Sequence, residues 1–259
     1  MCNCSKYCQL YRCKGIYTVK LSLNIHRVDF TIYLGGYYRM TNNDIMKHVD
    51  HTLLLAYASS SEILRICEEA TTHGMASVCI PPSYIAFAHK NYPELNICTV
   101  IGFPLGYSST NAKVQEIKDA LADGCNEFDM VINISWAING EYDRIMEEIK
   151  TLKAAVGDHI LKVIIETCYL SEEAKVQMCK AVTEAGADYI KTSTGFGTAG
   201  ATLEDIALFK AHIGPNVKIK AAGGVRTKAD MEAFLSAGCD RIGTSGAIKA
   251  LAGESFQGY

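Results

Sequence analysis

From residue 44 onward, short runs of β-branched and apolar residues alternate with longer stretches in which apolar residues recur every three or four positions. The first pattern is typical of buried strands, and the second of helices that pack one face against a sheet. A chain that alternates in this way is expected to form parallel β-α-β units, because each helix returns the chain to the edge where the next strand begins. This alternation restricts the fold more than any other feature of the sequence.

Six helices are predicted from the apolar spacing, and each is followed by a glycine that can take the left-handed conformation at a helix end. The predicted helices cover about 61–73 before Gly74, 110–123 before Gly124, 145–156 before Gly157, 171–185 before Gly186, 202–213 before Gly214 and 227–237 before Gly238. Serine or threonine begins most of these segments, as helix caps require.

Eight strand candidates lie between these helices, at residues 49–54, 76–80, 96–102, 126–132, 161–166, 188–192, 217–221 and 240–243. Eight strand–helix units favour an α/β protein that is a single TIM (β/α)8 barrel, and the length of 259 residues is close to the roughly 250 that such barrels need. An open, doubly wound sheet is the alternative, because periodicity alone does not show that a sheet closes.

Residues 1–39 differ in composition from residues 40–259, which we expect to form the barrel domain. They contain four cysteines and six tyrosines, and six basic against one acidic side chain give them a net charge of +5. They lack the apolar core of a signal peptide, and their cysteine spacing is not that of a paired zinc site. We interpret the segment as an extension outside the fold, with Met40 as the ordinary start; an organellar targeting peptide is the alternative.

The overall charge and the cysteine content exclude several classes of protein. The net charge of −3 provides no basic field for nucleic acid, and no apolar run approaches the roughly 18 residues that span a bilayer. Eleven cysteines are an odd number in a long chain, which favours reduced thiols over a disulfide framework. We therefore expect a cytoplasmic protein that binds neither nucleic acid nor membranes.

The strand candidates contain ionisable residues at positions where apolar side chains are expected. A single lysine in a strand usually points to solvent, but charged groups on five strands of one barrel would converge on one cavity at the C-terminal end. Buried charges are costly, so such groups are kept close together or kept for chemistry. The residues are Asp50, Asp129, Lys162, Glu166, Lys191 and Lys220.

Clustered lysines have a known chemical use. A protonated lysine cannot attack a carbonyl group, but a second ammonium nearby, together with burial, favours the neutral amine that forms a Schiff base. Lys191 is the favoured nucleophile, because a polar turn follows it and Lys220 lies on the next strand. Lys162 and Lys220 stay candidates, and Asp129 is placed to move protons.

Glycine-rich loops follow the last two strands. Gly223 and Gly224 precede Val225 and Arg226, and Gly243 precedes Thr244 and Ser245. In TIM barrels these two loops often bind phosphate, since glycine lets backbone N–H groups approach the anion. The segment Thr194-Gly195-Phe196-Gly197, after the sixth strand, is expected to add a third wall.

At these residues the sequence resembles the deoxyribose-phosphate aldolase family, from about residue 44 to the end. The matching segments are VDHTLL at 49–54, VCIPP at 78–82, VIGFP at 100–104, LKVIIET at 161–167, YIKTSTGF at 189–196 and IKAAGGVRT at 219–227. The extension and the NIS loop at 133–135 depart from the family pattern.

The resemblance implies a lyase that reversibly cleaves 2-deoxy-D-ribose 5-phosphate into glyceraldehyde 3-phosphate and acetaldehyde, in deoxyribose catabolism. It implies Schiff-base formation by Lys191, proton transfer by Lys220 and Asp129 with Lys162 in the relay, and no metal or other cofactor. The substrate-binding positions that it implies are Asp50, Thr52, Cys79, Thr192, Gly195, Gly223, Gly224, Val225, Arg226, Gly243, Thr244 and Ser245.

Two other functions stay open from the sequence. A transaldolase-like enzyme would use the same lysine on a ketose phosphate, and a non-catalytic phosphosugar-binding barrel would explain the glycines but leave the lysines and Asp129 without a role. The expected partner is a small phosphosugar. A homo-oligomer, either a dimer or a tetramer, is compatible with the sequence, as is an ending at Tyr259 that folds over the site.

Overall fold

The computed structural model describes residues 8–13, 16–22, 29–35 and 40–254. The chain divides into two compact units, Met1–Thr41 and Asn42–Tyr259. The first contains an antiparallel sheet in the order β1-β2-β3, formed by β1 (Cys8–Cys13), β2 (Ile16–Ser22) and β3 (Asp29–Gly35). The sequence analysis predicted no strand here, although aromatic and β-branched residues recur in β2 and β3.

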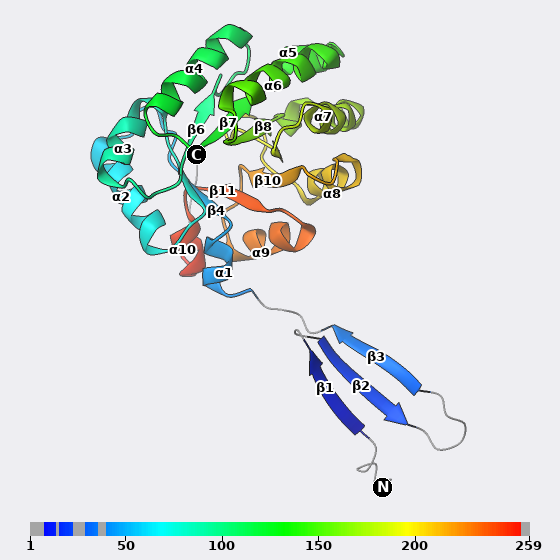
Figure 1. Ribbon diagram of the computed structural model, residues 1–259. Helices are drawn as coiled ribbons and strands as arrows, with labels where there is room; N and C mark the ends of the chain where they lie inside the picture. The colour runs from blue at the N-terminus through cyan, green and yellow to red at the C-terminus, as the bar shows by residue number, and fades with distance from the viewer. Residues whose placement is uncertain (1–7, 14–15, 23–28, 36–39, 255–259) are drawn as a thin grey trace. The chain divides into compact units, whose positions relative to one another are not determined.

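The second unit is a closed barrel of parallel strands with helices between them (Figure 1). Its strands are β4 (Val49–Thr52), β5 (Ser77–Cys79), β6 (Ile97–Ile101), β7 (Glu127–Val131), β8 (Ile160–Ile164), β9 (Tyr189–Lys191), β10 (Lys218–Ala222) and β11 (Arg241–Thr244). Each strand pairs with the next along the chain, and β11 pairs with β4 to close the ring. The predicted TIM barrel is confirmed, and the open-sheet alternative is wrong.

Helices follow the strands around the outside of the barrel (Figure 1). The α-helices are α1 (Asn42–Met46), α2 (Ser60–Thr72), α3 (Ile85–Asn91), α4 (Thr110–Ala122), α5 (Ile134–Ile138), α6 (Tyr142–Val156), α7 (Glu172–Glu184), α8 (Leu203–His212), α9 (Lys228–Ala237) and α10 (Ala247–Leu251). Two 3₁₀ turns, η1 (Pro82–Tyr84) and η2 (Thr167–Tyr169), follow β5 and β8. The sequence analysis missed α1, α3, α5 and α10, because helices of five to seven residues are too short to show a period.

The local sequence accounts for most helix ends. Ser171 caps α7 and Thr202 caps α8, and Thr227 caps α9 in a capping box with Asp230, as the positions of these hydroxyl residues predict. Five of the six predicted end glycines have a positive φ; the exception is Gly214. A Cβ atom there would lie 2.4 Å from Cγ2 of Thr183, so close packing is the reason for this glycine.

The apolar faces of the helices pack on the strands, with one unexpected charge between α4 and α6. Val114 was predicted to face the core, but Lys113 is the buried residue, and its Nζ lies 2.8 Å from Oε2 of Glu148 and 2.9 Å from the carbonyl oxygen of Val131. Burial lowers the pKa of Lys113, while Glu148 acts to raise it. A buried lysine with a carboxylate partner satisfies the requirement that buried charges be paired.

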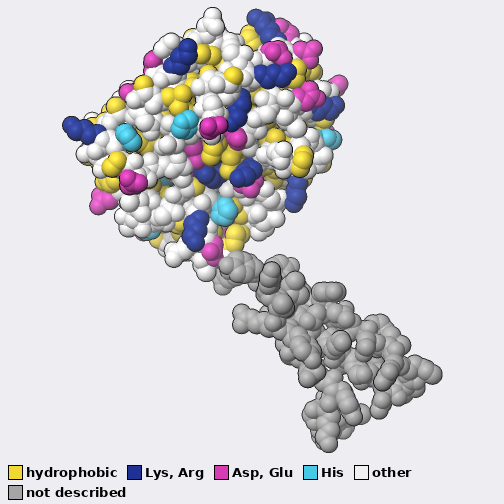
Figure 2. All heavy atoms as spheres, viewed as in Figure 1, with side chains coloured by type: hydrophobic (Ala, Val, Ile, Leu, Met, Phe, Trp, Pro, Cys, Tyr) yellow, Lys and Arg dark blue, Asp and Glu magenta, His cyan; other side chains and the backbone are white. Residues whose placement is uncertain are grey.

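Acidic and basic side chains are interspersed over the visible face of the barrel unit (Figure 2). Among the described residues, no helix is long and apolar enough to cross a membrane.

We propose that residues 40–259 form the folding domain and that residues 1–39 are dispensable for it. A chain that begins at Met40 should show the same cooperative thermal unfolding transition as the full chain, because the complete barrel lies in the second unit. Circular dichroism at increasing temperature measures this directly. A shortened chain that is insoluble, or that unfolds several degrees lower, would show that the first segment contributes to barrel stability.

Candidate active site

The register of the barrel strands brings charged residues close together inside the ring. Asp129 of β7 is paired directly with Lys162 of β8, and Lys191 of β9 is paired with Lys220 of β10. Paired residues on neighbouring strands face the same side of the sheet, and in a closed barrel the side chains of this parity point inward together. All four residues are buried, with exposed fractions of 3% for Lys191 and 0% for the other three.

Asp129 lies at the centre of this cluster. Its Oδ2 atom is 2.7 Å from Nζ of Lys191 and 2.7 Å from Nζ of Lys220, and its Oδ1 atom is 3.0 Å from Nζ of Lys162. One carboxylate therefore accepts from three lysines on three consecutive strands. The convergence predicted from the sequence occurs, and a proton can pass between Asp129 and any of these amines over a single hydrogen bond.

Two further carboxylates and an arginine complete the network on the side away from Lys191. Asp50 contacts Lys220 at 2.5 Å and Lys162 at 3.6 Å, and it also contacts Arg241. Glu127 contacts Lys162 at 2.5 Å and Arg241 at 3.1 Å. The sequence analysis missed Glu127 and Arg241, although Glu127 shares strand parity with Asp129 and Arg241 shares it with Gly243.

The pKa directions follow from this pairing. Burial acts to raise the pKa of Asp129 and of Asp50, but the neighbouring lysines outweigh it and hold both pKa values below the ordinary range. Burial acts to lower the pKa of Lys162 and of Lys220, but the carboxylates around them raise both pKa values above the ordinary one. Lys162 and Lys220 are therefore held as ammonium ions, and the two aspartates as carboxylates.

Two thiols lie beside Asp129. Sγ of Cys98 lies 3.2 Å from Oδ1 of Asp129 and 3.3 Å from Nζ of Lys162, and Cys79 faces it from the neighbouring strand. Within the described residues, Cys79, Cys98 and Asp129 are the group whose ligand atoms lie close enough to hold a metal ion. The lysines that bind Asp129 would repel a cation at this position.

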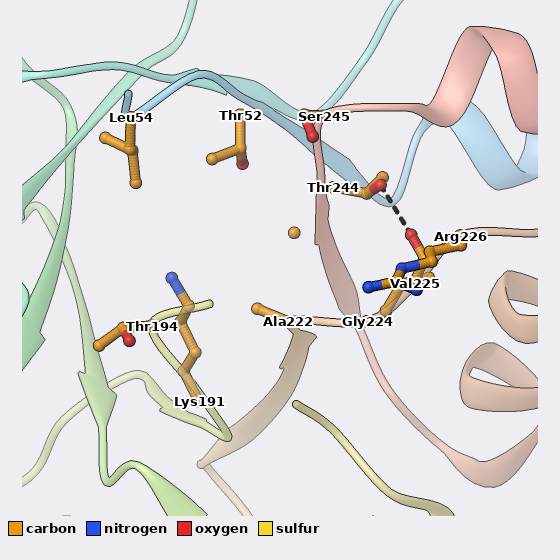
Figure 3. Close-up of a pocket in the computed structure, with 11 residues that line it drawn as sticks. Thr52, Leu54, Lys191, Thr194, Ala222, Gly224, Val225, Arg226, Thr244 and Ser245 are labelled. Carbon is orange, nitrogen blue, oxygen red and sulfur yellow. Dashed lines mark hydrogen bonds between the residues drawn. The ribbon is translucent and has the colours of Figure 1, made fainter. Parts of the chain in front are cut away.

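A pocket opens at the C-terminal end of the barrel, and Lys191 lies at its floor (Figure 3). Figure 3 shows the Lys191 amine pointing into the open space, with Thr194 beside it and Gly224, Val225 and Arg226 on the other side. The lining residues are Thr52, Leu54, Lys191, Thr194, Ala222, Gly224, Val225, Arg226, Gly243, Thr244 and Ser245. Of the three lysines that contact Asp129, Lys191 is therefore the one that reaches the pocket.

The loops after β10 and β11 are joined by hydrogen bonds at the pocket wall. Oγ1 of Thr244 donates to the carbonyl oxygen of Val225 at 2.9 Å and accepts from the backbone N–H of Gly246 at 3.2 Å. Gly224 has a φ of 75°, and the space where its side chain would lie is open. A Cβ atom on Gly243 would lie 3.3 Å from Cε of Lys220, so this glycine lets the lysine stem pass.

Seven of the twelve binding residues expected from the sequence line the pocket, and the other five are not part of its lining. Asp50 and Cys79 are buried in the barrel interior, and Oγ1 of Thr192 donates to the carbonyl oxygen of Ala222. Gly223 packs closely against Gly200, since a Cβ atom on Gly223 would lie 3.0 Å from Cα of Gly200. Gly195 does not line the pocket. Thr194 lines the pocket, as expected for the wall after the sixth strand, whereas the sequence analysis missed Leu54 and Ala222 at the strand ends.

The depressed pKa of Asp50 makes a prediction about acid stability. As the pH falls, the Asp50 carboxylate is protonated in the unfolded chain before it is protonated in the folded protein. The stabilisation from this carboxylate is therefore complete well above the ordinary pKa of 3.8 and is lost as the pH falls below that value. Asp50→Asn should destabilise the fold by roughly 3–5 kcal/mol near neutral pH. The difference in the free energy of unfolding between the two proteins should narrow by about 1.4 kcal/mol for each pH unit below the pKa of Asp50 in the unfolded chain. Urea unfolding of both proteins between pH 7 and pH 3 measures it; a deficit that stays constant over this range would contradict the pKa shift.

Comparisons with known proteins agree with this geometry. A family model described as DeoC/LacD family aldolase matches residues 45–253. A deoxyribose-phosphate aldolase of Clostridium botulinum (strain Alaska E43 / Type E3) is 64% identical over 221 residues, which cover 85% of this chain and 100% of the relative.

Solved structures with the same fold include QR15, an aldolase, with a TM-score of 0.78 and 38% identity over 81% of this chain and 95% of that one. The tetrameric deoxyribose phosphate aldolase of Aeropyrum pernix has a TM-score of 0.74 and 28% identity over 82% and 91% of the two chains. With a lysine cluster at the C-terminal end of a closed barrel and matches that span nearly the whole second unit, the chain belongs to the DeoC/LacD family of aldolases.

Proposed function

We propose that this protein is a deoxyribose-phosphate aldolase that reversibly cleaves 2-deoxy-D-ribose 5-phosphate through a Schiff base on Lys191. The names of relatives at 50–64% identity support the substrate. The observation that carries the proposal is the position of Lys191, whose amine reaches the pocket while bound to a carboxylate shared with two other lysines.

The three lysines differ in what they can do chemically. Lys162 and Lys220 are fully buried, and the carboxylates around them raise their pKa values, so both are held as ammonium ions without a free electron pair. A nucleophile must be a neutral amine in contact with the substrate. These two lysines therefore suit proton transfer, which leaves Lys191 as the group that attacks the carbonyl.

The charge balance of the network favours the same assignment. Asp50, Glu127 and Asp129 supply three negative charges, which the remaining cations Lys162, Lys220 and Arg241 neutralise without Lys191. Loss of a proton from Lys191 therefore leaves this network neutral rather than with an unpaired buried charge. Buried groups tend toward the protonation states that balance in this way.

The reaction proceeds in two stages on the lysine. The Lys191 amine adds to C1 of the open-chain aldehyde, and water leaves to give a protonated imine. The imine accepts the electron pair of the C2–C3 bond as the C3 hydroxyl loses its proton, so glyceraldehyde 3-phosphate leaves and an enamine stays on Lys191. Protonation at C2 and addition of water release acetaldehyde and restore the amine.

Asp129 and Lys220 supply the proton transfers in these steps. Asp129 is within one hydrogen bond of Lys191 and of Lys220, so it can take a proton from one and return it to the other. Lys162 contacts the second oxygen of Asp129 and completes the relay. These steps use side chains of this chain alone, and the proposal includes no metal or other cofactor.

The loops after β10 and β11 are the proposed phosphate site. Gly224, Val225, Thr244 and Ser245 line the pocket on the side across from Thr194, and Arg226 adds a positive charge (Figure 3). This separation leaves the Lys191 end of the pocket for the aldehyde carbon. Backbone groups of glycine-rich loops bind phosphate without the need for long side chains.

The setting of the enzyme is part of the proposal. The tetrameric relative from A. pernix supports a homo-oligomer, either a dimer or a tetramer. Among residues 40–254, the seven cysteines are free thiols, which suits the reducing cytoplasm.

Trapping the Schiff base tests the proposed nucleophile. Acetaldehyde and borohydride should leave a reduced two-carbon adduct on Lys191, which peptide mass spectrometry locates, and Lys191→Arg should form none. An adduct on Lys162 or Lys220 of the unaltered protein would overturn the assignment of the nucleophile, although the protein would still be a lysine-dependent aldolase.

Lys220→Leu should lose most of the activity, because it removes a proton-transfer group that contacts Asp129. If 2-deoxyribose 5-phosphate gives no acetaldehyde, the proposed substrate is wrong.

Substitutions in the loops test the phosphate site. Gly224→Val and Ser245→Glu should weaken the use of 2-deoxyribose 5-phosphate far more than that of free deoxyribose, because a bulky side chain blocks the anion and a carboxylate repels it. Steady-state kinetics on the two sugars gives the comparison. Ser61→Glu, on the exposed surface of α2, is the control for added charge. Equal losses on both sugars would place the phosphate elsewhere.

A further inference from the structure

Glu166, directly after β8, is a buried carboxylate that the proposed reaction does not use. Its side chain is 1% exposed, and its φ of 51° makes it the one non-glycine residue with a positive φ among the described residues. A side chain rarely adopts this left-handed conformation unless the surrounding structure imposes it, and such residues gather at functional sites. The sequence analysis had grouped Glu166 with the interior charges, but its carboxylate faces the loop after β9 instead.

The carboxylate is bound by Thr194. The backbone N–H of Thr194 donates to Oε1 at 3.1 Å and to Oε2 at 3.3 Å, and Oγ1 of Thr194 donates to Oε2. Oγ1 in turn accepts from the backbone N–H of Phe196 at 3.0 Å. Because the hydroxyl of Thr194 has a single hydrogen, donating it to Glu166 leaves its lone pairs free to accept from Phe196. Glu166 thus orders the backbone N–H of Thr194 directly and that of Phe196 through the Thr194 hydroxyl.

The far end of the same loop also packs against Glu166. A Cβ atom on Gly197 would lie 3.2 Å from Cδ and Oε1 of Glu166 and 2.9 Å from Sγ of Cys168. The close approach explains why glycine occupies this position. Between these two attachments, the ring of Phe196 packs edge-on against Phe103, with centroids 5.4 Å apart, so the loop after β9 also contacts the loop after β6.

The ordered loop forms the wall of the pocket beside the nucleophile. Thr194 lines the pocket three residues after Lys191, and Figure 3 shows both on the side away from Arg226. Burial raises the pKa of Glu166, while the hydrogen bonds from Thr194 and the nearby Lys191 act in the opposite direction. The loop held by Glu166 therefore borders the aldehyde end of the pocket and not the proposed phosphate end.

We infer that Glu166 is a positioning residue that fixes the loop of residues 194–197 and so places Thr194 beside the Lys191 amine, at the aldehyde end of the substrate. This inference rests on the proposed aldolase function for the part of its test that uses substrate. It assigns Glu166 no contact with the reacting atoms: its effect passes through Thr194.

Kinetics of a double-mutant cycle tests this route. Glu166→Gln should lower kcat/KM by roughly tenfold to a hundredfold, the range expected when a wall of the site is misplaced by less than about 1 Å. The loss should be equal for 2-deoxyribose 5-phosphate and free deoxyribose, since the phosphate loops are unchanged. Thr194→Val should lower kcat/KM by a similar factor. The double variant Glu166→Gln/Thr194→Val should lose no more than the more impaired single variant. Thr194→Ser should retain activity, because it keeps both hydrogen bonds of the hydroxyl group.

A second measurement needs no substrate. Hydrogen–deuterium exchange at the amides of residues 194–197 should accelerate in Glu166→Gln and in Gly197→Ala, which displaces the carboxylate without altering it. Glu148→Gln is the matched control, because Glu148 is an equally buried carboxylate that binds Lys113 outside the barrel. It should lower thermal stability while leaving exchange in this loop and both kinetic constants unchanged at temperatures where the protein is folded.

The outcomes separate the alternatives. Losses that multiply in the double variant, or a Thr194→Ser variant as impaired as Thr194→Val, would show that Glu166 acts independently of Thr194 and would overturn the inference. Unchanged exchange in both Glu166→Gln and Gly197→Ala would do the same, whatever the substrate. If the unaltered protein releases no acetaldehyde yet exchange accelerates in the variants, the proposed function fails while the role of Glu166 in ordering the loop stands.

Discussion

The carboxylate of Asp129, shared by three lysines, is the interaction on which the rest of the site depends. A buried ammonium ion is unstable without an anion, and a buried carboxylate with three cationic neighbours is stable only when further anions restore the balance. Asp50 and Glu127 provide that balance. The network can exist only where neighbouring strands hold these residues close together inside the ring, so the closed barrel and the chemistry of its interior depend on each other.

The same network makes three chemically identical side chains different. All three lysines contact Asp129. Lys162 and Lys220 are also bound by the other carboxylates and do not line the pocket, whereas the amine of Lys191 reaches its open space. Environment, rather than residue type, thus separates the two ammonium ions from the proposed nucleophile. The surrounding loops also differ in position: those after β10 and β11 form the proposed phosphate site, while the loop after β9 borders the Lys191 amine.

Close packing around the site explains two of its glycines. Gly243 allows the stem of Lys220 to pass, and Gly197 allows its loop to approach Glu166. Neither glycine is needed for a turn with positive φ, so a sequence-based interpretation of glycine as a phosphate ligand or a helix end misses their role. Gly214, which packs against Thr183, is a further case.

The sequence by itself determined the class of fold and the identity of the central charges. Strand and helix periods, with serine and threonine caps, are local properties that survive without tertiary context, and Asp129, Lys162, Lys191 and Lys220 stood out because charges are rare in buried strands. Tertiary structure alone decided the rest. Strand register and ring closure bring Glu127 and Arg241 into the network and bury Asp50 and Cys79 in the barrel interior. They also place the Glu166 carboxylate against Thr194, and the short helices likewise depend on tertiary packing. Register and closure bring together residues far apart in the chain, and no local pattern records such distances.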